Sequence, residues 1–284
     1  MNSKRTKVPL ASKIALLVAC FFWAISFIAT KVALETVPAL SVVSFRLIIS
    51  GICFLLWLLV RRSGIKLGHP VWIGKLFVLS LFGTGLHYWL QTEGIGITTA
   101  SNASIYAATG PVLITIIAVI FLNERITWKK ALGIGCALAG VLVVMGIDNL
   151  LSFKLKGHLL GDLLVFSSIL MWAVFTVMGK RMTRQMSILD ITTVVTVMGA
   201  IYMAPLGIME MNQASISLLT IPARAWAAIG FLGVTCSFLA TLLYFYALEK
   251  TESQKVGVYL YTIPPMTVII ASIYLKETIG FNLF

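Results

Sequence analysis

Polar and aromatic side chains that could recognise a small molecule lie inside long apolar segments of this sequence. His87, Tyr88 and Gln91 fall together in one such segment. A polar side chain at membrane depth is costly, so it normally faces a cavity or a partner. Histidine can also change its charge near neutral pH. This group predicts hydrogen bonds to a substrate or a proton relay; the alternative is a neutral histidine bonded to a neighbouring helix.

Two prolines interrupt two further apolar segments. Pro111 and Pro264 each remove one backbone hydrogen bond and favour a kink. The carbonyls of Ala107 and Leu260, which those missing N–H groups would have bound, could face a cavity. Paired interruptions in corresponding helices are the best sequence indication of a binding site at mid-membrane. A purely structural kink is the alternative.

A third group combines amide, phenol and indole side chains: Asn102, Tyr106, Trp172, Tyr244 and Tyr259. Aromatic faces suit apolar or cationic substrates, so these residues could line an amphipathic pocket. Asparagine can equally bond between helices. The rings can instead anchor the segments at the membrane interface.

The charged residues favour structural roles. For Arg46, in the second apolar segment, a contact between helices or snorkelling to the interface is favoured over binding a carboxylate. Glu124 and Glu277 fall at segment ends, where each would cap the free amides of the next helix. No carboxylate falls at mid-depth of a segment, so a proton antiporter with a central glutamate is not supported. His87 would be the fallback for proton coupling.

Nothing in the residue pattern predicts catalysis. The three histidines, His69, His87 and His158, are far apart, and the four cysteines read as small buried hydrophobes. No metal-ligand spacing, phosphate loop or nucleophile triad is present. The sequence therefore predicts a protein that is not an enzyme and that needs no cofactor and no metal.

The composition explains where these residues must be held. The chain has 284 residues, of which 59% are hydrophobic and 11% charged, whereas soluble domains are about 25% charged. So few charged residues could not cover the surface of a soluble protein of this size. The formal net charge of +12 would suggest nucleic acid in a soluble protein. Here the basic residues lie between apolar runs, so no nucleic-acid partner is expected.

The apolar runs have the length of membrane-crossing helices, about 20 residues each. They cover residues 14–34, 39–60, 71–92, 98–122, 131–147, 159–180, 190–209, 223–248 and 255–275. A helix satisfies its own backbone in lipid, which predicts an all-α integral membrane protein. Most of the 22 Lys and Arg residues fall on the side of the N-terminus, which predicts a cytoplasmic N-terminus in a multi-pass protein of the cell (inner) membrane.

An internal repeat predicts the arrangement of these helices. Trp23 recurs as Trp172 near the start of each half, and Tyr106, Pro111 and Glu124 recur 153 residues later as Tyr259, Pro264 and Glu277. Five helices in each half would turn the second copy upside-down relative to the first, as in many transporters. The expected repeats cover residues 1–148 and 157–284. A tenth run begins near Ile279 and stops at Phe284, so the second repeat is expected to lack most of its last helix.

The order of several short motifs resembles the EamA-type branch of the drug/metabolite transporter superfamily. The motifs are Phe22-Trp23-Ala24-Ile25-Ser26-Phe27, Ser44-Phe45-Arg46, Thr109-Gly110-Pro111, Phe121-Leu122-Asn123-Glu124-Arg125 and Tyr274-Leu275-Lys276-Glu277. The resemblance implies a ten-helix plan, a central cavity between two five-helix repeats and export of small metabolites. Amino acids or related amphipathic compounds are the implied substrates, with a drug or a nucleotide sugar as the alternative.

The expected partners follow from this assignment. They are a small-molecule substrate, with or without coupled protons, and the lipid bilayer. The chain is expected to act as a monomer or a homodimer.

The inverted repeat can be tested by labelling. Asn123 and Lys276 follow corresponding helices of the two halves, so they should lie on opposite faces of the membrane. Single cysteines at these two positions in sealed cells should react differently with a membrane-impermeant thiol reagent, with position 276 labelled from outside and position 123 protected. Equal labelling of both positions would refute the inverted arrangement.

Overall fold

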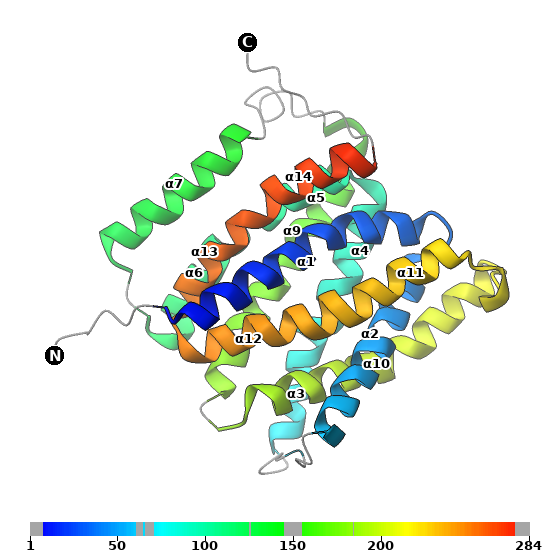
Figure 1. Cartoon of the computed structure of the whole chain (residues 1–284), viewed down its shortest axis with the longest axis horizontal. Helices are drawn as coiled ribbons and strands as arrows, with labels where there is room; N and C mark the ends of the chain where they lie inside the picture. Colours follow the sequence, from blue (N-terminus) through cyan, green and yellow to red (C-terminus); the bar gives the residue numbers. More distant parts are fainter. Residues whose placement is uncertain are drawn as a thin grey trace.

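The computed structural model describes residues 8–60, 65, 71–124, 126–144, 155–183 and 185–275. All regular structure in this part of the chain is helical (Figure 1). In the first half the α-helices are α1 Leu10–Leu34, α2 Ala39–Val60, α3 Val71–Ser80, α4 His87–Ile97, α5 Ala100–Ala107, α6 Gly110–Leu122 and α7 Trp128–Val144. In the second half they are α9 Leu155–Met182, α10 Ile188–Gln213, α11 Ala223–Phe231, α12 Thr241–Lys250, α13 Ser253–Tyr259 and α14 Ile263–Tyr274.

Four short segments of other helical types join these elements. Two are π-helical, η1 Leu81–Leu86 and η3 Leu232–Ala240. Two are 3₁₀-helical, η2 Leu218–Thr220 and η4 Leu260–Thr262.

Eight helical stretches of the described chain are long and apolar enough to cross a membrane. They cover Leu10–Leu34, Ala39–Val60, Val71–Ile97, Ala100–Leu122, Leu159–Met182, Ile188–Gln213, Ala223–Lys250 and Ser253–Tyr274. These stretches confirm the predicted all-α membrane fold. The remaining predicted span corresponds to α7, a shorter helix of 17 residues at the edge of the bundle beside α14 (Figure 1). The expected start of a tenth helix near Ile279 lies outside the described residues.

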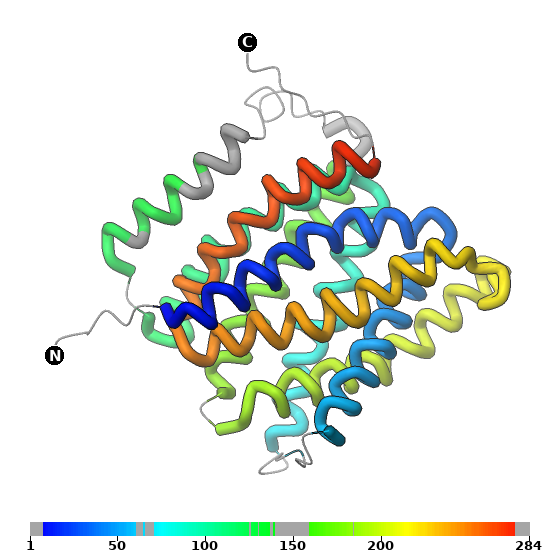
Figure 2. The backbone as a smooth tube through the Cα atoms, viewed as in Figure 1, coloured from blue at the N-terminus to red at the C-terminus, as the bar shows by residue number. Residues whose placement is uncertain are grey.

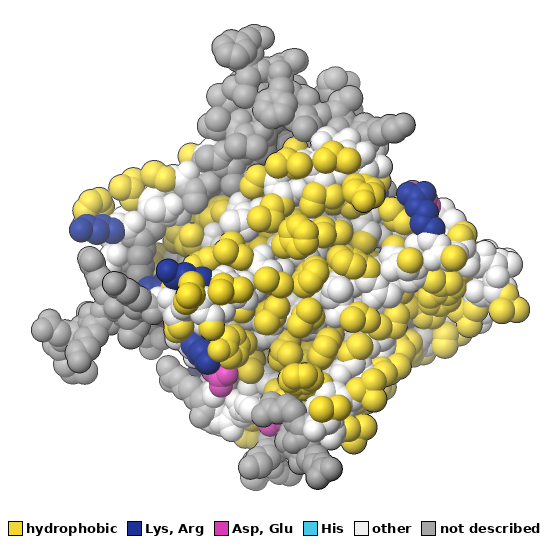
Figure 3. Space-filling model, viewed as in Figure 1, with side chains coloured by type: hydrophobic (Ala, Val, Ile, Leu, Met, Phe, Trp, Pro, Cys, Tyr) yellow, Lys and Arg dark blue, Asp and Glu magenta, His cyan; other side chains and the backbone are white. Residues whose placement is uncertain are grey.

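The outer surface of the bundle is apolar. Large hydrophobic side chains such as Leu59, Val60 and Ile201 are each about 70% exposed. In the face drawn in Figure 3, hydrophobic side chains cover most of the surface, and the Lys and Arg side chains lie at its margins. Soluble monomers rarely expose apolar patches of this extent, whereas lipid tails accept them.

Helices of the two halves pack against each other directly. α2 lies along α10, α4 along α9, and α1 between α12 and α14 (Figures 1 and 2). Hydroxyl groups and a glycine allow α2 and α10 to approach closely. Ser41 donates its backbone N–H and its hydroxyl to Glu210 Oε2, each at 2.8 Å. A Cβ atom added to Gly207 would lie 2.3 Å from Ser44 Oγ.

The two spans that contain Pro111 and Pro264 are broken at the prolines and not merely kinked. α5 ends at Ala107, and α6 starts at Gly110 with Pro111 in its first turn. In the second half, α13 gives way to η4 before Pro264 enters the first turn of α14. The two breaks fall at corresponding positions of the predicted repeat. That the two halves are mutually inverted stays a prediction.

The π-helical segments were not predicted. η1 precedes α4, and η3 precedes α12, so each interrupts the third span of its half. π-Helical hydrogen bonds run to the fifth residue instead of the fourth, and such segments occur frequently at functional sites.

The contact between α4 and α9 depends on two glycines that face each other. A Cβ atom on Gly161 would lie 3.0 Å from the carbonyl oxygen of Gly94 and 2.9 Å from Ile97 Cβ. Gly161 is therefore a position where the two backbones approach too closely for a side chain.

Gly161→Val should force α4 away from α9 and destabilise the protein. Overpacking of this kind costs about 1–3 kcal/mol. Gly230→Val is the matched control, because nothing lies within 4 Å of a Cβ atom at Gly230. Thermal unfolding in detergent should give a lower melting temperature for the Gly161 variant alone. Equal melting temperatures for the two variants would contradict this account of the contact.

Candidate substrate-binding cavity

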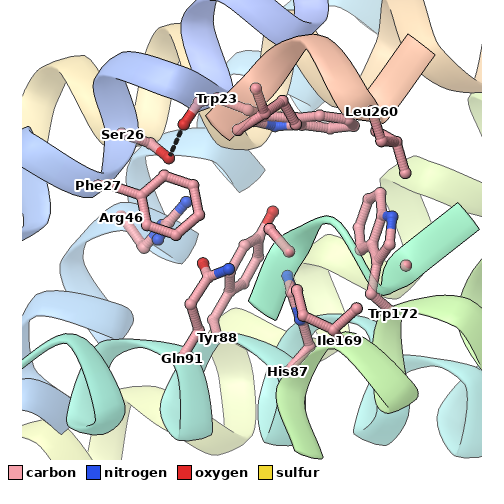
Figure 4. A pocket seen from close by; sticks show the side chains of 13 residues that line it. Trp23, Ser26, Phe27, Arg46, His87, Tyr88, Gln91, Ile169, Trp172 and Leu260 are labelled. Carbon is pink, nitrogen blue, oxygen red and sulfur yellow. Dashed lines mark hydrogen bonds between the residues drawn. The ribbon is translucent and has the colours of Figure 1, made fainter. Parts of the chain in front are cut away.

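A cavity lies between helices of both halves, at the level of the helix breaks. It holds about 540 Å³ of empty space, the open space at its mouth included. Side chains from α1, α2, α4 and α9 face it, and the break regions before α6 and α14 complete the wall (Figure 4). This empty space falls within the range of about 300–1,000 Å³ that is usual for small-molecule sites.

The cavity is narrow in this conformation. The centre of a water molecule can reach only about 50 Å³ of it, and a single water needs about 10–15 Å³ by this measure. The space therefore holds a few water molecules. A larger guest requires the surrounding helices or side chains to move apart.

Two tryptophans from corresponding positions of the two halves meet at the cavity. The ring centroids of Trp23 and Trp172 lie 5.2 Å apart, edge to face. Trp23 Nε1 donates to the carbonyl oxygen of Cys236, at 3.1 Å, inside the π-helical segment η3. This bond fixes the indole and leaves its ring to form an apolar wall, as seen in Figure 4.

His87 is buried and held in a defined orientation. Its Nδ1 lies 2.9 Å from the carbonyl oxygen of Ser168 on α9. A carbonyl only accepts, so Nδ1 carries the hydrogen and Nε2 of the neutral ring is left as an acceptor. The ring lies between Tyr88 and Trp172, with centroid distances of 4.9 and 5.1 Å.

Arg46 brings a positive charge to the cavity wall. Its side chain is only 2% exposed. Nε donates to Ser237 Oγ at 2.9 Å, and the guanidinium carbon lies 4.0 Å from the centre of the Tyr88 ring. The expected contact between helices is therefore present, but snorkelling is wrong, because the charge is buried inside the bundle. Arg46 was not among the predicted site residues, although it lines the cavity; its position seven residues inside α2 is the sequence signal for its burial.

Four of the ten predicted site residues line this cavity: His87, Tyr88, Gln91 and Trp172. The other six do not: Asn102, Tyr106, Pro111, Tyr244, Tyr259 and Pro264. Several of these six residues are adjacent in the sequence to a residue that does line the cavity. Those lining neighbours are Ala107, Gly110, Leu260 and Ile263. The substrate contacts of all ten stay predictions.

The residues outside the wall have other surroundings. The backbone N–H of Asn102 bonds to Thr99 Oγ1 at the start of α5. Tyr106 and Tyr259 pack against the main core cluster, and Tyr244 is fully buried against both cavity tryptophans. Pro111 contacts α13, where its Cα would lie 3.4 Å from a Cβ at Gly257.

The freed carbonyls differ from the expectation in one case. Ala107 and Leu260 do line the cavity. However, the Leu260 carbonyl accepts the N–H of Ile263, so it is not free.

Glu124 caps a different helix from the one expected. Its Oε1 accepts the N–H of Ser253, the first residue of α13, at 3.1 Å. The Lys180 ammonium lies 3.6 Å from the same oxygen and donates to the carbonyl of Thr251. The carboxylate therefore joins the end of α6 to α9 and α13, and not to the following helix α7. Glu277 lies outside the described residues.

The described residues hold no group of three or more His, Cys, Asp or Glu side chains that could bind a metal. The cavity and the apolar spans together define a multi-pass membrane protein of the transporter class.

Comparisons with known proteins agree with this class. The model of the EamA-like transporter family matches twice, over residues 11–146 and 159–284. The chain belongs to the EamA-like transporter family.

Two of the similar proteins are named uncharacterized transporters. An uncharacterized transporter of Archaeoglobus fulgidus is 28% identical over 98% of this chain and 91% of its own. The uncharacterized transporter YetK of Bacillus subtilis is 25% identical over 90% of this chain and 77% of its own. A crystal structure with 19% identity covers 98% of this chain and 94% of its own with a TM-score of 0.72, which supports the fold.

Proposed function

We propose that this protein exports small amphipathic metabolites, amino acids or related compounds, across the cell membrane by alternating access. The observation that carries the proposal is the cavity between the two halves. Its walls are largely aromatic and aliphatic, with a few polar groups such as His87, Gln91 and Ser26. Such a wall suits a ligand with an apolar body and one or two hydrogen-bonding groups.

The proposed orientation has the N-terminus in the cytoplasm. Lys and Arg are concentrated at the helix ends on that side, which include Lys180, Lys250 and Lys255. In this orientation the end of α6 and the start of α13 face the cytoplasm.

In the proposed orientation, packed side chains lie between the cavity and the cytoplasm. Below Trp172, the rings of Phe175, Tyr244 and Phe245 form a fully buried layer, with centroid distances of 5.0 to 5.6 Å between neighbouring rings. Below that layer, Glu124 and Lys180 tie α6, α9 and α13 together. Loading from the cytoplasm therefore requires the aromatic layer and the ion pair to separate.

The transport step needs no covalent chemistry. One chain carries the whole cavity, so a monomer suffices, and a homodimer would contain two sites. The substrate moves down its own gradient or against protons. In the second case His87 is the cavity group that would take up a proton, through Nε2.

A drug or a nucleotide sugar of similar size is the second candidate substrate. The cavity tryptophans Trp23 and Trp172 favour it, because flat rings stack on aromatic faces.

Proteoliposomes containing the purified full chain, supplied with a panel of amino acids, related metabolites, drugs and nucleotide sugars, test the proposal. We expect saturable flux of at least one amphipathic metabolite. Gln91→Leu should raise the KM about threefold to tenfold, because one hydrogen bond to the substrate is worth about 0.5–1.5 kcal/mol.

Thr92→Val is the matched control for this variant. Thr92 is the next residue on α4, is fully buried and does not line the cavity, and its hydroxyl has no hydrogen-bond partner in the described part of the chain. Its KM should equal that of the unmodified protein. Absence of saturable flux for the whole panel, or an equal effect of both substitutions, would contradict the proposal.

A further inference from the structure

The cavity wall contains a buried positive charge that has no carboxylate counter-ion among the described residues. Arg46 is 2% exposed and lines the cavity. Within the described residues, no Asp or Glu oxygen lies within 4.0 Å of its nitrogens, since the described ion pairs join Lys180, Arg224 and Lys255 to other residues. Arg46 is thus a buried cation without a carboxylate partner among the residues that the structure describes.

The guanidinium uses only part of its bonding capacity. It has five N–H donors, of which the one on Nε donates to Ser237 Oγ at 2.9 Å. The two terminal nitrogens carry the other four N–H groups, and the bond from Nε is the one that the Arg46 side chain makes to the described residues. The Tyr88 ring, 4.0 Å from the guanidinium carbon, attracts the cation without neutralising it.

The same bonds fix the direction of the guanidinium. Ser237 lies in η3, and α2 packs tightly on this segment, where a Cβ on Gly233 would lie 3.1 Å from the carbonyl oxygen of Arg46. Nε is held by Ser237 and one face is covered by Tyr88, so the terminal nitrogens are the donors that Arg46 has left for a ligand in the cavity that it lines. A planar fork of this kind matches the two oxygens of a carboxylate.

We propose that Arg46 binds an anionic group of the substrate, a carboxylate, inside this cavity. An isolated buried charge is costly and an intramembrane ionisable residue normally serves function, so a ligand carboxylate completes the site. This inference rests on the proposed function and narrows its substrate class to compounds that carry a carboxylate on an aromatic or branched aliphatic body.

The rest of the wall supports the same class. Several other lining residues are apolar: Phe27, Ile169, Leu260 and Ile263. None of the described residues that line the cavity is Asp or Glu, so a substrate ammonium would find only neutral acceptors and ring faces there. The carboxylate is therefore required and an amino group is not, and cationic drugs are disfavoured by the charge of Arg46.

Three probes that share the phenylalanine side chain separate the effect of charge from that of the apolar body: N-acetylphenylalanine, its uncharged amide of nearly the same shape, and the cationic phenylalanine methyl ester. Binding to the purified full chain is measured in detergent, at constant chloride, by the concentration dependence of the melting temperature. The unmodified protein should bind the anion at least about tenfold more tightly than the amide, and the cation least tightly. Equal affinities for anion and amide, or no binding of the anion, would overturn the inference.

Variants assign the preference to Arg46. Arg46→Gln should bring the affinities for anion and amide within about twofold of each other while the amide affinity stays unchanged, and Arg46→Lys should retain part of the preference. Arg224→Gln is the control, because Arg224 pairs with Glu35 at an exposed site outside the cavity. An intact anion preference in Arg46→Gln would overturn the assignment. If neither Arg46 variant folds, the three-probe comparison on the unmodified protein decides.

The outcome is independent of the flux assay. Binding of the anion without flux of any compound would contradict the transport proposal and leave the anion site standing. Saturable flux of substrates without a negatively charged group would do the reverse.

Discussion

A polar group inside this protein is costly without a hydrogen-bond partner, because lipid and apolar side chains offer none. Most polar side chains satisfy this constraint locally or across one helix contact. Ser26 donates to the carbonyl of Trp23 at 2.6 Å, Ser44 to that of Met203 at 2.6 Å, and Thr267 to that of Ala24 at 3.2 Å. Some buried groups have no hydrogen-bond partner among the described residues, such as the hydroxyl of Thr92 and the amide of Gln254. Among the cavity-lining residues, the groups with spare hydrogen-bonding capacity are Arg46, the free nitrogen of His87 and the amide of Gln91.

The same constraint applies to the backbone groups at the helix breaks. A proline or a π-helical segment inside a span leaves backbone groups without their usual partner. Here side chains of other helices supply it, as when Trp23 Nε1 bonds the Cys236 carbonyl in η3. The breaks before Pro111 and Pro264 flank the cavity, so the helices that would have to bend during transport are discontinuous at the level of the proposed site.

Local pattern was sufficient to predict the fold and part of the candidate site. Hydropathy and length predicted the all-α membrane architecture, and polar residues inside a span pointed to His87, Tyr88 and Gln91, which line the cavity. It was harder to predict which side chains point into the cavity. Successive residues are rotated by about 100° around a helix, and a helix break changes the direction in which the following residues point. Tyr106 and Pro111 were chosen while Ala107 and Gly110 line the wall. The Glu124 bond to Ser253 and the burial of Arg46 depend on contacts between halves, which no local pattern encodes.

The central claim is that one cavity between the two halves opens in turn to each side of the membrane. Ser26→Cys, in a chain whose four native cysteines are replaced, reports on it directly, because Ser26 lines the cavity wall. Its rate of modification by a membrane-impermeant thiol reagent is measured in right-side-out and in inside-out vesicles. The account predicts modification from both sides, slowed from both sides by a transported substrate. Modification from one side only, under all substrate conditions, would contradict it.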